Sequence, residues 1–260
     1  MNRYINILEA LRKDISAKKN KKDHDLSMEA FTGHYKRYQD VIGLISHQLK
    51  KGKILDIGAS PYHMTYCLKK LGFDVWGIDL NPNILKEFQI KHRLKIKRCN
   101  IEKEKTSFKD EVFDLVVFTE ILEHLGNDPL GVLKEIRRIL KPKGLIFLST
   151  PNIYTLHKII MFIVGRSFND ALGELKKVES TGYMGHIREY SNREIKMMLE
   201  YCGYKVKDIY FRKYNDYFLG PKVVRKTPLI LLGAFLEMVT SFISFLRPTQ
   251  IMIAEKRRLG

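Results

Sequence analysis

Cysteine is scarce in this chain, whose 260 residues include only Cys67, Cys99 and Cys202. The three lie far apart and lack the short spacing of metal ligands, so neither a disulfide framework nor a cysteine-based zinc site is expected. They are typical of reduced, buried thiols. We therefore expect a cytoplasmic protein.

The sequence also lacks an apolar segment of signal-peptide length near its start, an internal repeat and a low-complexity tract. A hydrophobic content of 45% with 29% charged residues is too apolar for a disordered protein and too interrupted for a polytopic membrane protein. The length suits one large α/β core. We expect one domain with appendages.

Acidic residues are in short supply, with 29 against 46 basic ones and a net charge of +17. Two interpretations stay open: attraction to an anionic partner, or a general richness in lysine. The basic residues are spread from Lys50 to Arg258 and form no stripe with interleaved aromatics. Nucleic acid is therefore a less favoured partner than a small molecule.

Long hydrophobic runs are absent except for Leu229–Leu246, in which Glu237 is the one charged residue. The run barely reaches transmembrane length. If it crossed a bilayer, the following β-like run Gln250–Ala254 would be carried to the far side and lost from the sheet. A packed helix, or a helix lying in a membrane interface as a peripheral contact through 229–246, is favoured over a span.

Short β-branched, apolar runs alternate with helical patterns, which indicates an α/β protein with a parallel sheet. Two later runs are expected to pair antiparallel at the sheet edge. The expected strands are Lys53–Ile57, Asp74–Asp79, Leu94–Cys99, Phe113–Phe118, Leu145–Ser149, Lys205–Phe211 and Gln250–Ala254.

Helix and turn signals separate these runs. An N-cap followed by proline at Asn81-Pro82 and at Asp128-Pro129 predicts two helix starts, and Lys141–Gly144 predicts a turn. The second half of the chain then has an amphipathic stretch, a polar loop and a helix, at Ile153–Val164, Gly165–Gly185 and Asn192–Cys202.

A ligand site is expected at the carboxyl ends of the first two strands. Asp56 lies near the end of a buried strand with Gly58 just beyond it, and Asp79 ends the next strand. A glycine lets backbone approach a ligand, and a carboxylate at this spacing can accept both hydroxyls of a ribose. A turn glycine and a capping aspartate would explain either feature alone, but their combination favours nucleoside binding.

A second polar group follows the fourth strand. Glu120, Glu123 and His124 would share one face of a helical turn, and a remote His186 could join them. Two carboxylates and imidazoles suit a divalent metal ion. Equally, Glu123 and His124 could cap and hydrogen-bond this loop while His186 holds a lid.

Roughly residues 31 to 255 resemble the class I S-adenosylmethionine (SAM)-dependent methyltransferases. The resemblance is carried by Ile54–Ser60, Phe113–Leu125, Leu133–Gly144, Thr150–Asn152 and Gly185–Ser191. It implies a Rossmann-like, mostly parallel seven-stranded sheet with an antiparallel edge hairpin and helical insertions. It also implies three regions: a helical cap (1–50), a SAM-binding core (51–150), and a substrate-side lid with an apolar helical insertion and the final strands (151–260).

The resemblance implies a role for individual residues. Those expected to bind SAM are Asp56, Gly58, Ala59 and Ser60 at the methionine end, Asp79 and Leu80 at the ribose, Asn100 and Ile101 at the adenine, and Thr119 near the sulfonium. The chain departs from the family where Ser60 and Tyr62 replace glycines and where Asn100 replaces a commoner aspartate. An amide oxygen can still accept from the adenine amino group.

The Glu-x-x-Glu-His pattern with a later histidine resembles two metal-assisted subfamilies, the ubiquinone-biosynthesis O-methyltransferases and the small-RNA 3′-terminal 2′-O-methyltransferases. The resemblance implies a divalent metal such as Mg²⁺ on Glu120, Glu123, His124 and His186, which would activate a substrate hydroxyl. Without metal, His124 or His186 is the expected general base.

We expect O-methylation of a small-molecule, lipid or glycan hydroxyl. Two alternatives stay open: RNA ribose 2′-O-methylation, and a membrane-associated protein that binds SAM without catalysis. Four residues before the first strand could close over the site from an N-terminal helix or could form a half-buried, solvated helix face: His34, Tyr35, Arg37 and Tyr38.

Overall fold

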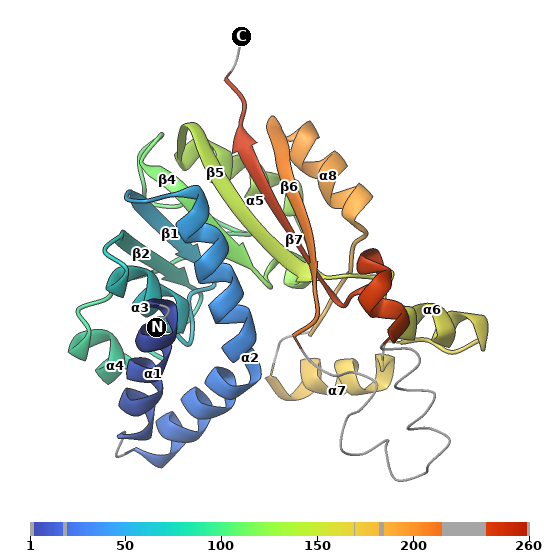
Figure 1. The fold of residues 1–260 in the computed structure, drawn as a ribbon, viewed down its shortest axis with the longest axis horizontal. Coiled ribbons are helices and arrows are strands. Elements are labelled where there is room, and N and C mark those ends of the chain that lie inside the picture. Colours follow the sequence, from blue (N-terminus) through green and yellow to red (C-terminus); the bar gives the residue numbers. More distant parts are fainter. Residues whose placement is uncertain (1–2, 18–19, 169, 182–184, 215–237, 259–260) are drawn as a thin grey trace.

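A seven-stranded sheet forms the centre of the computed structural model (Figure 1), which describes residues 3–17, 20–168, 170–181, 185–214 and 238–258. The strand order is β3-β2-β1-β4-β5-β7-β6. The strands are β1 Lys53–Ile57, β2 Asp74–Asp79, β3 Lys95–Arg98, β4 Phe113–Thr119, β5 Leu140–Pro151, β6 Tyr204–Arg212 and β7 Thr249–Lys256.

Strands β1 to β5 run parallel, whereas β7 pairs antiparallel with both β5 and β6. This confirms the predicted mixed sheet with antiparallel strands at one edge. Because the carboxyl ends of parallel strands meet at one edge of the sheet, residues that end β1, β2 and β4 lie close together. The sheet thereby collects the polar side chains of the expected ligand site.

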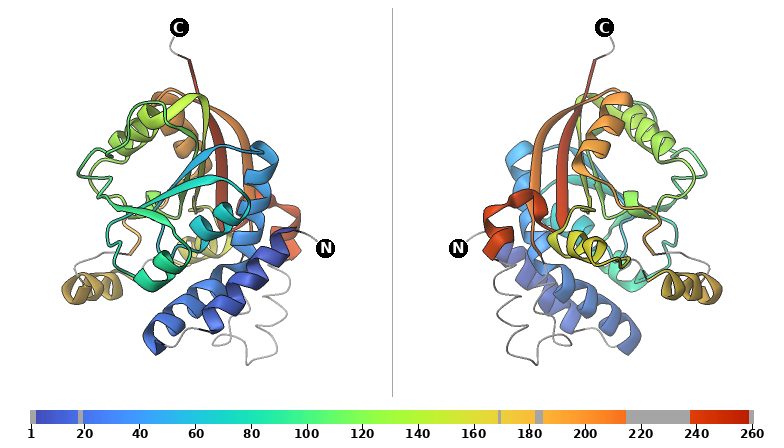
Figure 2. Two further views of the ribbon diagram at one scale, coloured as in Figure 1. Left: turned by 90° about the vertical axis from the view of Figure 1, so that its left-hand side faces the viewer. Right: turned by 90° about the vertical axis from the view of Figure 1, so that its right-hand side faces the viewer.

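Helices cover both faces of the sheet (Figure 2). Alternate residues of each buried strand point to opposite faces, so Ile54 packs with α1 to α4 while Leu55 packs with α5 and α8. The helices are α1 Arg3–Ser16, α2 Lys21–Gln48, α3 His63–Lys70, α4 Lys86–Lys91, α5 Pro129–Ile139, α6 Leu156–Ile163, α7 Ala171–Thr181 and α8 Asn192–Tyr201, with short 3₁₀ turns η1 Leu122–His124 and η2 Ser244–Leu246.

Two helices begin with side-chain caps, of which the one at Asp128-Pro129 was predicted. The Asp128 carboxylate accepts a hydrogen bond from the Gly131 amide at 2.8 Å, with Pro129 as the first helical residue of α5. Ser191 and Glu194 form a reciprocal capping box at the start of α8. Both helices therefore begin where the sequence predicts.

The prediction of a helix start at Asn81-Pro82 is wrong. The Asn81 side chain accepts from the Asn83 amide and makes a local turn, and α4 begins only at Lys86.

The prediction of a polar loop over Gly165–Gly185 is also wrong in part, because α7 lies within it. The Asp170 carboxylate accepts from the Gly173 amide and supplies the cap that the sequence analysis overlooked.

The turn expected over Lys141–Gly144 is instead part of β5, which begins at Leu140. Lys143 has a φ of 64°, and the pairing register between β4 and β5 shifts near Phe113. The strand thus absorbs the change of direction as an irregularity rather than as a separate turn.

Helices α6 and α7 lie beyond the carboxyl ends of the parallel strands (Figure 1). Helix α6 has no buried residue along its length. Of the apolar run 229–246, residues 229–237 lie outside the described part, while 238–242 are helical and lead into η2. Among the helices that the structure describes, none combines the length and apolar character needed to cross a bilayer.

Candidate functional site

The loop after β1 approaches the edge of the sheet through a left-handed glycine. Gly58 has a φ of 68°, a region that side chains with a Cβ disfavour. The Gly58 and Ala59 amides both donate to the Ile78 carbonyl, at 2.9 Å and 3.1 Å, which ties the loop to β2. A Cβ on Gly58 would also overlap the side chain of Ile121.

The two predicted aspartates bracket this loop. Asp56 is buried and accepts a hydrogen bond from the Thr65 hydroxyl at 2.6 Å. Burial raises the pKa of Asp56 to about 7, because an ionised carboxylate loses hydration inside the protein. The Asp79 carboxylate accepts from the Ser60 and Asn81 amides, each at 2.9 Å, and so holds the loop against the end of β2.

A cavity of about 190 Å³ opens beside the loop, and α2 forms its other wall. His34, Arg37 and Tyr38 line it from α2, opposite Asp56 and Gly58. These three side chains thus face the cavity from a helix on which His34 and Arg37 are half-buried, whereas Tyr35 does not line it. Burial lowers the pKa of His34 to about 4, so its imidazole is neutral at physiological pH.

The other residues expected at the cofactor site occupy the same edge. Ala59, Ser60 and Thr119 also line the 190 Å³ cavity. Leu80, Asn100 and Ile101 do not line it and lie at the ends of β2 and β3. The Asn100 side-chain oxygen accepts from the Glu102 amide at 3.3 Å.

Glu120 differs from the expectation of one helical turn. Its φ is 56°, and the 3₁₀ turn η1 begins only at Leu122. The Glu120 carboxylate lies 3.2 Å from the Arg37 guanidinium and accepts from the Ser149 hydroxyl at 2.7 Å. It therefore faces the 190 Å³ cavity rather than sharing a helical face with Glu123 and His124.

Glu123, His124 and His186 do come together. Among the described residues these three form a group whose ligand atoms all lie within 4.8 Å of one another. Glu123 is 1% exposed, and the Thr150 hydroxyl donates to its Oε2 at 2.8 Å. Its Oε1 is buried without a hydrogen-bond partner among the described residues. Burial and the neighbouring Glu120 raise the pKa of Glu123 to about 7.

An orphaned carboxylate oxygen fits a cation. His124 Nε2 lies 4.0 Å from Glu123 Oε1, and the ring centroids of His124 and His186 lie 5.2 Å apart. Burial lowers the pKa of His124, whereas the hydrogen bond to Glu189 raises the pKa of His186. One carboxylate and two imidazole nitrogens are a donor set that suits a divalent transition metal.

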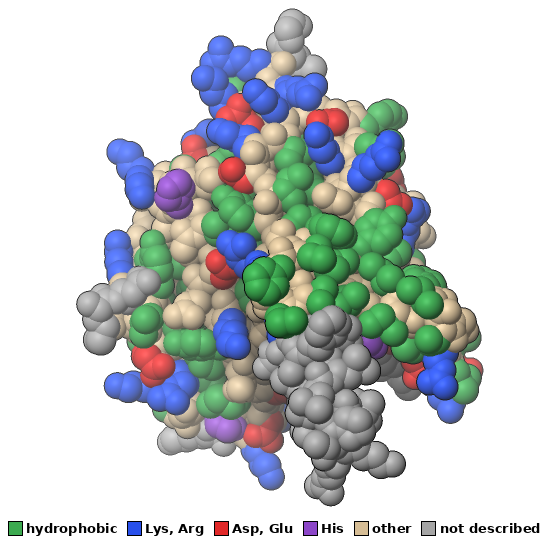
Figure 3. Space-filling view, turned by 45° about the vertical axis from the view of Figure 1, so that its right-hand side comes forward, with side chains coloured by type: hydrophobic (Ala, Val, Ile, Leu, Met, Phe, Trp, Pro, Cys, Tyr) green, Lys and Arg blue, Asp and Glu red, His purple; other side chains and the backbone are tan. Residues whose placement is uncertain are grey.

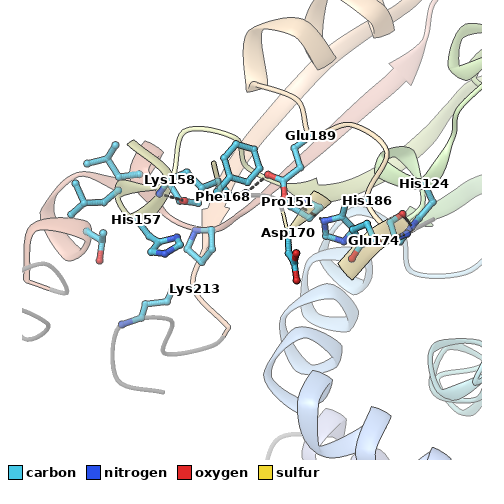
Figure 4. A pocket seen from close by; sticks show the side chains of 16 residues that line it. His124, Pro151, His157, Lys158, Phe168, Asp170, Glu174, His186, Glu189 and Lys213 are labelled. Carbon is cyan, nitrogen blue, oxygen red and sulfur yellow. Dashed lines mark hydrogen bonds and ion pairs between the residues drawn. The ribbon is translucent and has the colours of Figure 1, made fainter. Parts of the chain in front are cut away.

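A larger cavity of about 640 Å³ adjoins this group (Figure 4). His124 and His186 lie at one end, and His157 and Lys213 lie at the other. Apolar side chains contribute much of its lining: Pro151, Leu156, Phe168, Leu246 and Pro248. The cavity can hold a substrate next to the three candidate ligands.

Two half-buried residues of this cavity, Lys158 and Glu189, were not predicted from the sequence. Lys158 of α6 forms an ion pair with Glu189, and the Glu189 carboxylate also contacts His186 Nδ1 at 3.3 Å. Glu189 lies in the quoted motif Gly185–Ser191, which was a usable signal. Nothing in the sequence of α6 distinguishes Lys158 from a solvated lysine.

Comparisons with known proteins identify the family of the chain. The family model described as a methyltransferase domain matches residues 30–209, more than half of the chain. A ubiquinone biosynthesis O-methyltransferase of Haemophilus ducreyi is 32% identical over 124 residues, covering 45% of this chain and 52% of that protein. An uncharacterized protein of Methanocaldococcus jannaschii is 37% identical over 131 residues, covering 50% and 54%. The chain thus matches about half the length of these relatives.

Solved structures show the same fold. A SAM-dependent methyltransferase from Archaeoglobus fulgidus has a TM-score of 0.58 at 18% identity, covering 86% of this chain and 94% of that chain. A complex between the Haloferax volcanii Trm112 methyltransferase activator and a methyltransferase contains a chain with a TM-score of 0.61 at 16% identity, covering 92% and 98%.

Proposed function

This chain belongs to the methyltransferase domain family and is a SAM-dependent methyltransferase, and from that premise we propose that it methylates a hydroxyl oxygen with the help of a divalent metal. One observation carries the proposal: the buried Glu123 Oε1 has no hydrogen-bond partner among the described residues and lies beside His124 and His186. An unpaired buried oxygen is costly unless it has a ligand.

The proposed SAM site is the loop after β1. Asp56 would pair with the methionine ammonium and Arg37 with the methionine carboxylate, since both line the 190 Å³ cavity. Asp79 would accept from the ribose hydroxyls and Asn100 from the adenine amino group. The roles of Gly58, Ala59, Ser60, Leu80, Ile101 and Thr119, and the division into 1–50, 51–150 and 151–260, are part of the same proposal.

Glu123, His124 and His186 would hold the metal, which when bound lowers the pKa of a substrate hydroxyl. Glu120 is an additional candidate, although its carboxylate engages Arg37 and Ser149. Thr150 orients Glu123 by donating to Oε2, which leaves Oε1 directed away from that bond. In the absence of metal, the Nε2 atom of His124 or His186 would take the hydroxyl proton.

The acceptor would occupy the 640 Å³ cavity, whose size suits a small molecule, or the head of a lipid or glycan. The ubiquinone-biosynthesis name of one relative supports an oxygen acceptor. A water-excluding apolar lining would hold the hydroxyl near the methyl donor, because orientation of two reactants lowers the barrier to transfer.

Peripheral contact with a membrane is part of the proposal, with the cytoplasm as the proposed location. The side chains of Ile163 on α6 and of Phe242 are 78% and 83% exposed. Helix α6 and the helical residues 238–242 also contribute to the lining of the 640 Å³ cavity. Hydrophobic side chains gather on this face of the molecule (Figure 3). Loss of co-sedimentation with anionic vesicles in Phe242→Ser, but not in Tyr201→Ser on α8, would support the contact; equal sedimentation of both variants would contradict it.

Calorimetry tests the cofactor and metal sites separately. We expect SAM to bind the wild type and to be lost in Asp79→Ala. Asp74→Ala is the matched control, because Asp74 begins the same strand and pairs with Lys95 on the surface. Bound Mg²⁺ or Mn²⁺ should be lost in Glu123→Ala while SAM binding persists. Folded wild type without SAM affinity would overturn the cofactor site, and SAM binding without metal affinity would overturn metal assistance alone.

A further inference from the structure

The two histidines of the candidate metal site share one arrangement. His124 Nδ1 lies 2.6 Å from the Gly185 carbonyl oxygen, and His186 Nδ1 lies 3.3 Å from Glu189 Oε1. A carbonyl and an ionised carboxylate can only accept hydrogen bonds, so each Nδ1 carries the proton. In the neutral form of each imidazole the lone pair is therefore on Nε2, the atom left to bind a ligand.

The two groups that accept from the Nδ1 atoms, the Gly185 carbonyl and the Glu189 carboxylate, differ in how they are held in place. The Gly185 carbonyl is backbone, and the Gly185 amide donates to Glu174 Oε2 of α7 at 2.6 Å. Glu189 is a side chain and needs a partner to stay in place. Lys158 supplies it through an ion pair with Glu189 Oε2 (Figure 4) and also donates to the Asn152 carbonyl at 2.9 Å.

The Lys158–Glu189 pair is removed from solvent. The Lys158 and Glu189 side chains are 13% and 7% exposed. Burial opposes ionisation of Glu189, but its hydrogen bond from His186 and the charge of Lys158 keep its pKa below the ordinary value. Burying two charges is expensive, and apolar side chains of similar volume would usually stabilise the fold as well. Stability alone is thus a poor explanation for this pair.

We propose that Glu189 is a positioning residue that holds His186 in the Nδ1-protonated tautomer, with Nε2 directed to Glu123 and His124, and that Lys158 holds Glu189 in turn. The metal in this inference comes from the proposed function, whereas the contacts among Lys158, Glu189 and His186 do not depend on it. Carboxylates that accept from the distal nitrogen of a ligating histidine orient the ring and raise its basicity. Because Lys158 is on α6, the pair also links the wall of the 640 Å³ cavity to the candidate metal ligands.

The first measurement is the tautomer of His186 in the metal-free protein. Long-range ¹⁵N–¹H spectra at pH 8 should show His186 protonated on Nδ1 in the wild type and in Glu189→Gln, whose amide oxygen still accepts. Glu189→Ala should give a mixture of His186 tautomers. Lys158→Met should give a share of the Nδ1-protonated tautomer between those of the wild type and Glu189→Ala. Arg188→Gln is the matched control, since Arg188 pairs with Glu194 on the surface of the same segment.

The second measurement is Mn²⁺ affinity by calorimetry. Glu189→Ala should weaken it about 10- to 100-fold, the usual effect of losing such an outer partner, and Glu189→Gln should weaken it less. Arg188→Gln should leave it unchanged. An unchanged His186 tautomer in Glu189→Ala would overturn the proposal. If that variant does not fold, an unchanged tautomer and unchanged Mn²⁺ affinity in Lys158→Met would overturn the role of the pair. Absence of Mn²⁺ affinity in the wild type would overturn the proposed metal site. The His186 tautomer in Glu189→Ala would still decide the role of Glu189.

Discussion

Binding of SAM should strengthen as the pH rises through the pKa of Asp56. Burial raises that pKa to about 7 in the unliganded protein, so much of the Asp56 carboxyl is protonated just below neutrality. A methionine ammonium beside it favours the ionised carboxylate. Binding at pH 6 must therefore release a proton from Asp56 before the ion pair forms.

The size of the effect follows from that pKa. Between pH 7 and pH 5.5 the fraction of ionised Asp56 falls from about one half to about 3%, and the dissociation constant for SAM should rise about 15-fold, about 1.6 kcal/mol. Measurements should stay below pH 7, because an α-amino group itself loses its proton near pH 8. Calorimetry in two buffers of different ionisation enthalpy would report the released proton directly.

Asp56→Asn is the control, since an amide oxygen can still accept from Thr65 but does not ionise. Its affinity should be lower at pH 7 and almost independent of pH between 5.5 and 7. Equal pH slopes in the two proteins would refute the reasoning. Thermal unfolding gives a second check. Because the folded pKa of Asp56 exceeds the ordinary value of 3.8, the free energy of unfolding of the unliganded wild type should fall relative to that of Asp56→Asn as the pH rises from about 4 to 7.

Three further predictions concern stability. Gly58→Ala should lower the free energy of unfolding by about 1–2 kcal/mol, because the backbone at this position has a left-handed φ. Adding Ile121→Val should restore only the part of the lost stability that is due to overlap with the Ile121 side chain. Full restoration of the stability would contradict backbone strain. Ser191→Ala should cost about 1 kcal/mol in chemical denaturation, whereas Ser191→Thr should retain the capping box with Glu194; an equal loss in both would argue against the cap. Tyr204→Phe should cost about 1 kcal/mol, because the buried hydroxyl donates to the backbone of α5 at 2.9 Å, and an unchanged denaturation midpoint would show that this bond adds nothing.

Strand positions were predictable from the sequence because parallel strands buried on both faces must be apolar along their length. The runs that end near Asp56, Asp79 and Thr119 each became a strand within a residue or two of the expected ends. Their carboxyl ends meet at one edge for topological reasons, so the neighbourhood of the ligand site followed from the strand order alone.

Local polar signals were less reliable. Asn81-Pro82 carries the chemistry of a helix start, but the same side-chain oxygen can close a turn instead, and here it does. Helix α7, Ala171–Thr181, lies within the segment Gly165–Gly185 that was predicted to be a polar loop. A cap at Asp170 was the signal that could have corrected this.

The candidate metal group was partly predictable. Glu123 and His124 are neighbours in sequence, and His186 joins them because the Ile187 amide donates to the Glu123 carbonyl at 2.8 Å. The pairing of Glu120 with Arg37, and of Glu189 with Lys158, joins segments far apart in the chain. No spacing in a single sequence reveals such partners, because they depend on how α2 and α6 pack.

Strand β7 lies between β5 and β6, although it follows both in the chain. During synthesis β6 therefore has no neighbour until residues 249–256 arrive. Residues 213–248 separate the two strands. Their synthesis takes roughly 2–7 s at about 5–20 residues per second. Through that interval the nascent chain carries an unpaired strand edge, and Lys205, Lys207 and Asp208 give it charges that discourage pairing with another chain. We therefore expect the charges of β6 to lower aggregation of the nascent chain before β7 pairs with this strand.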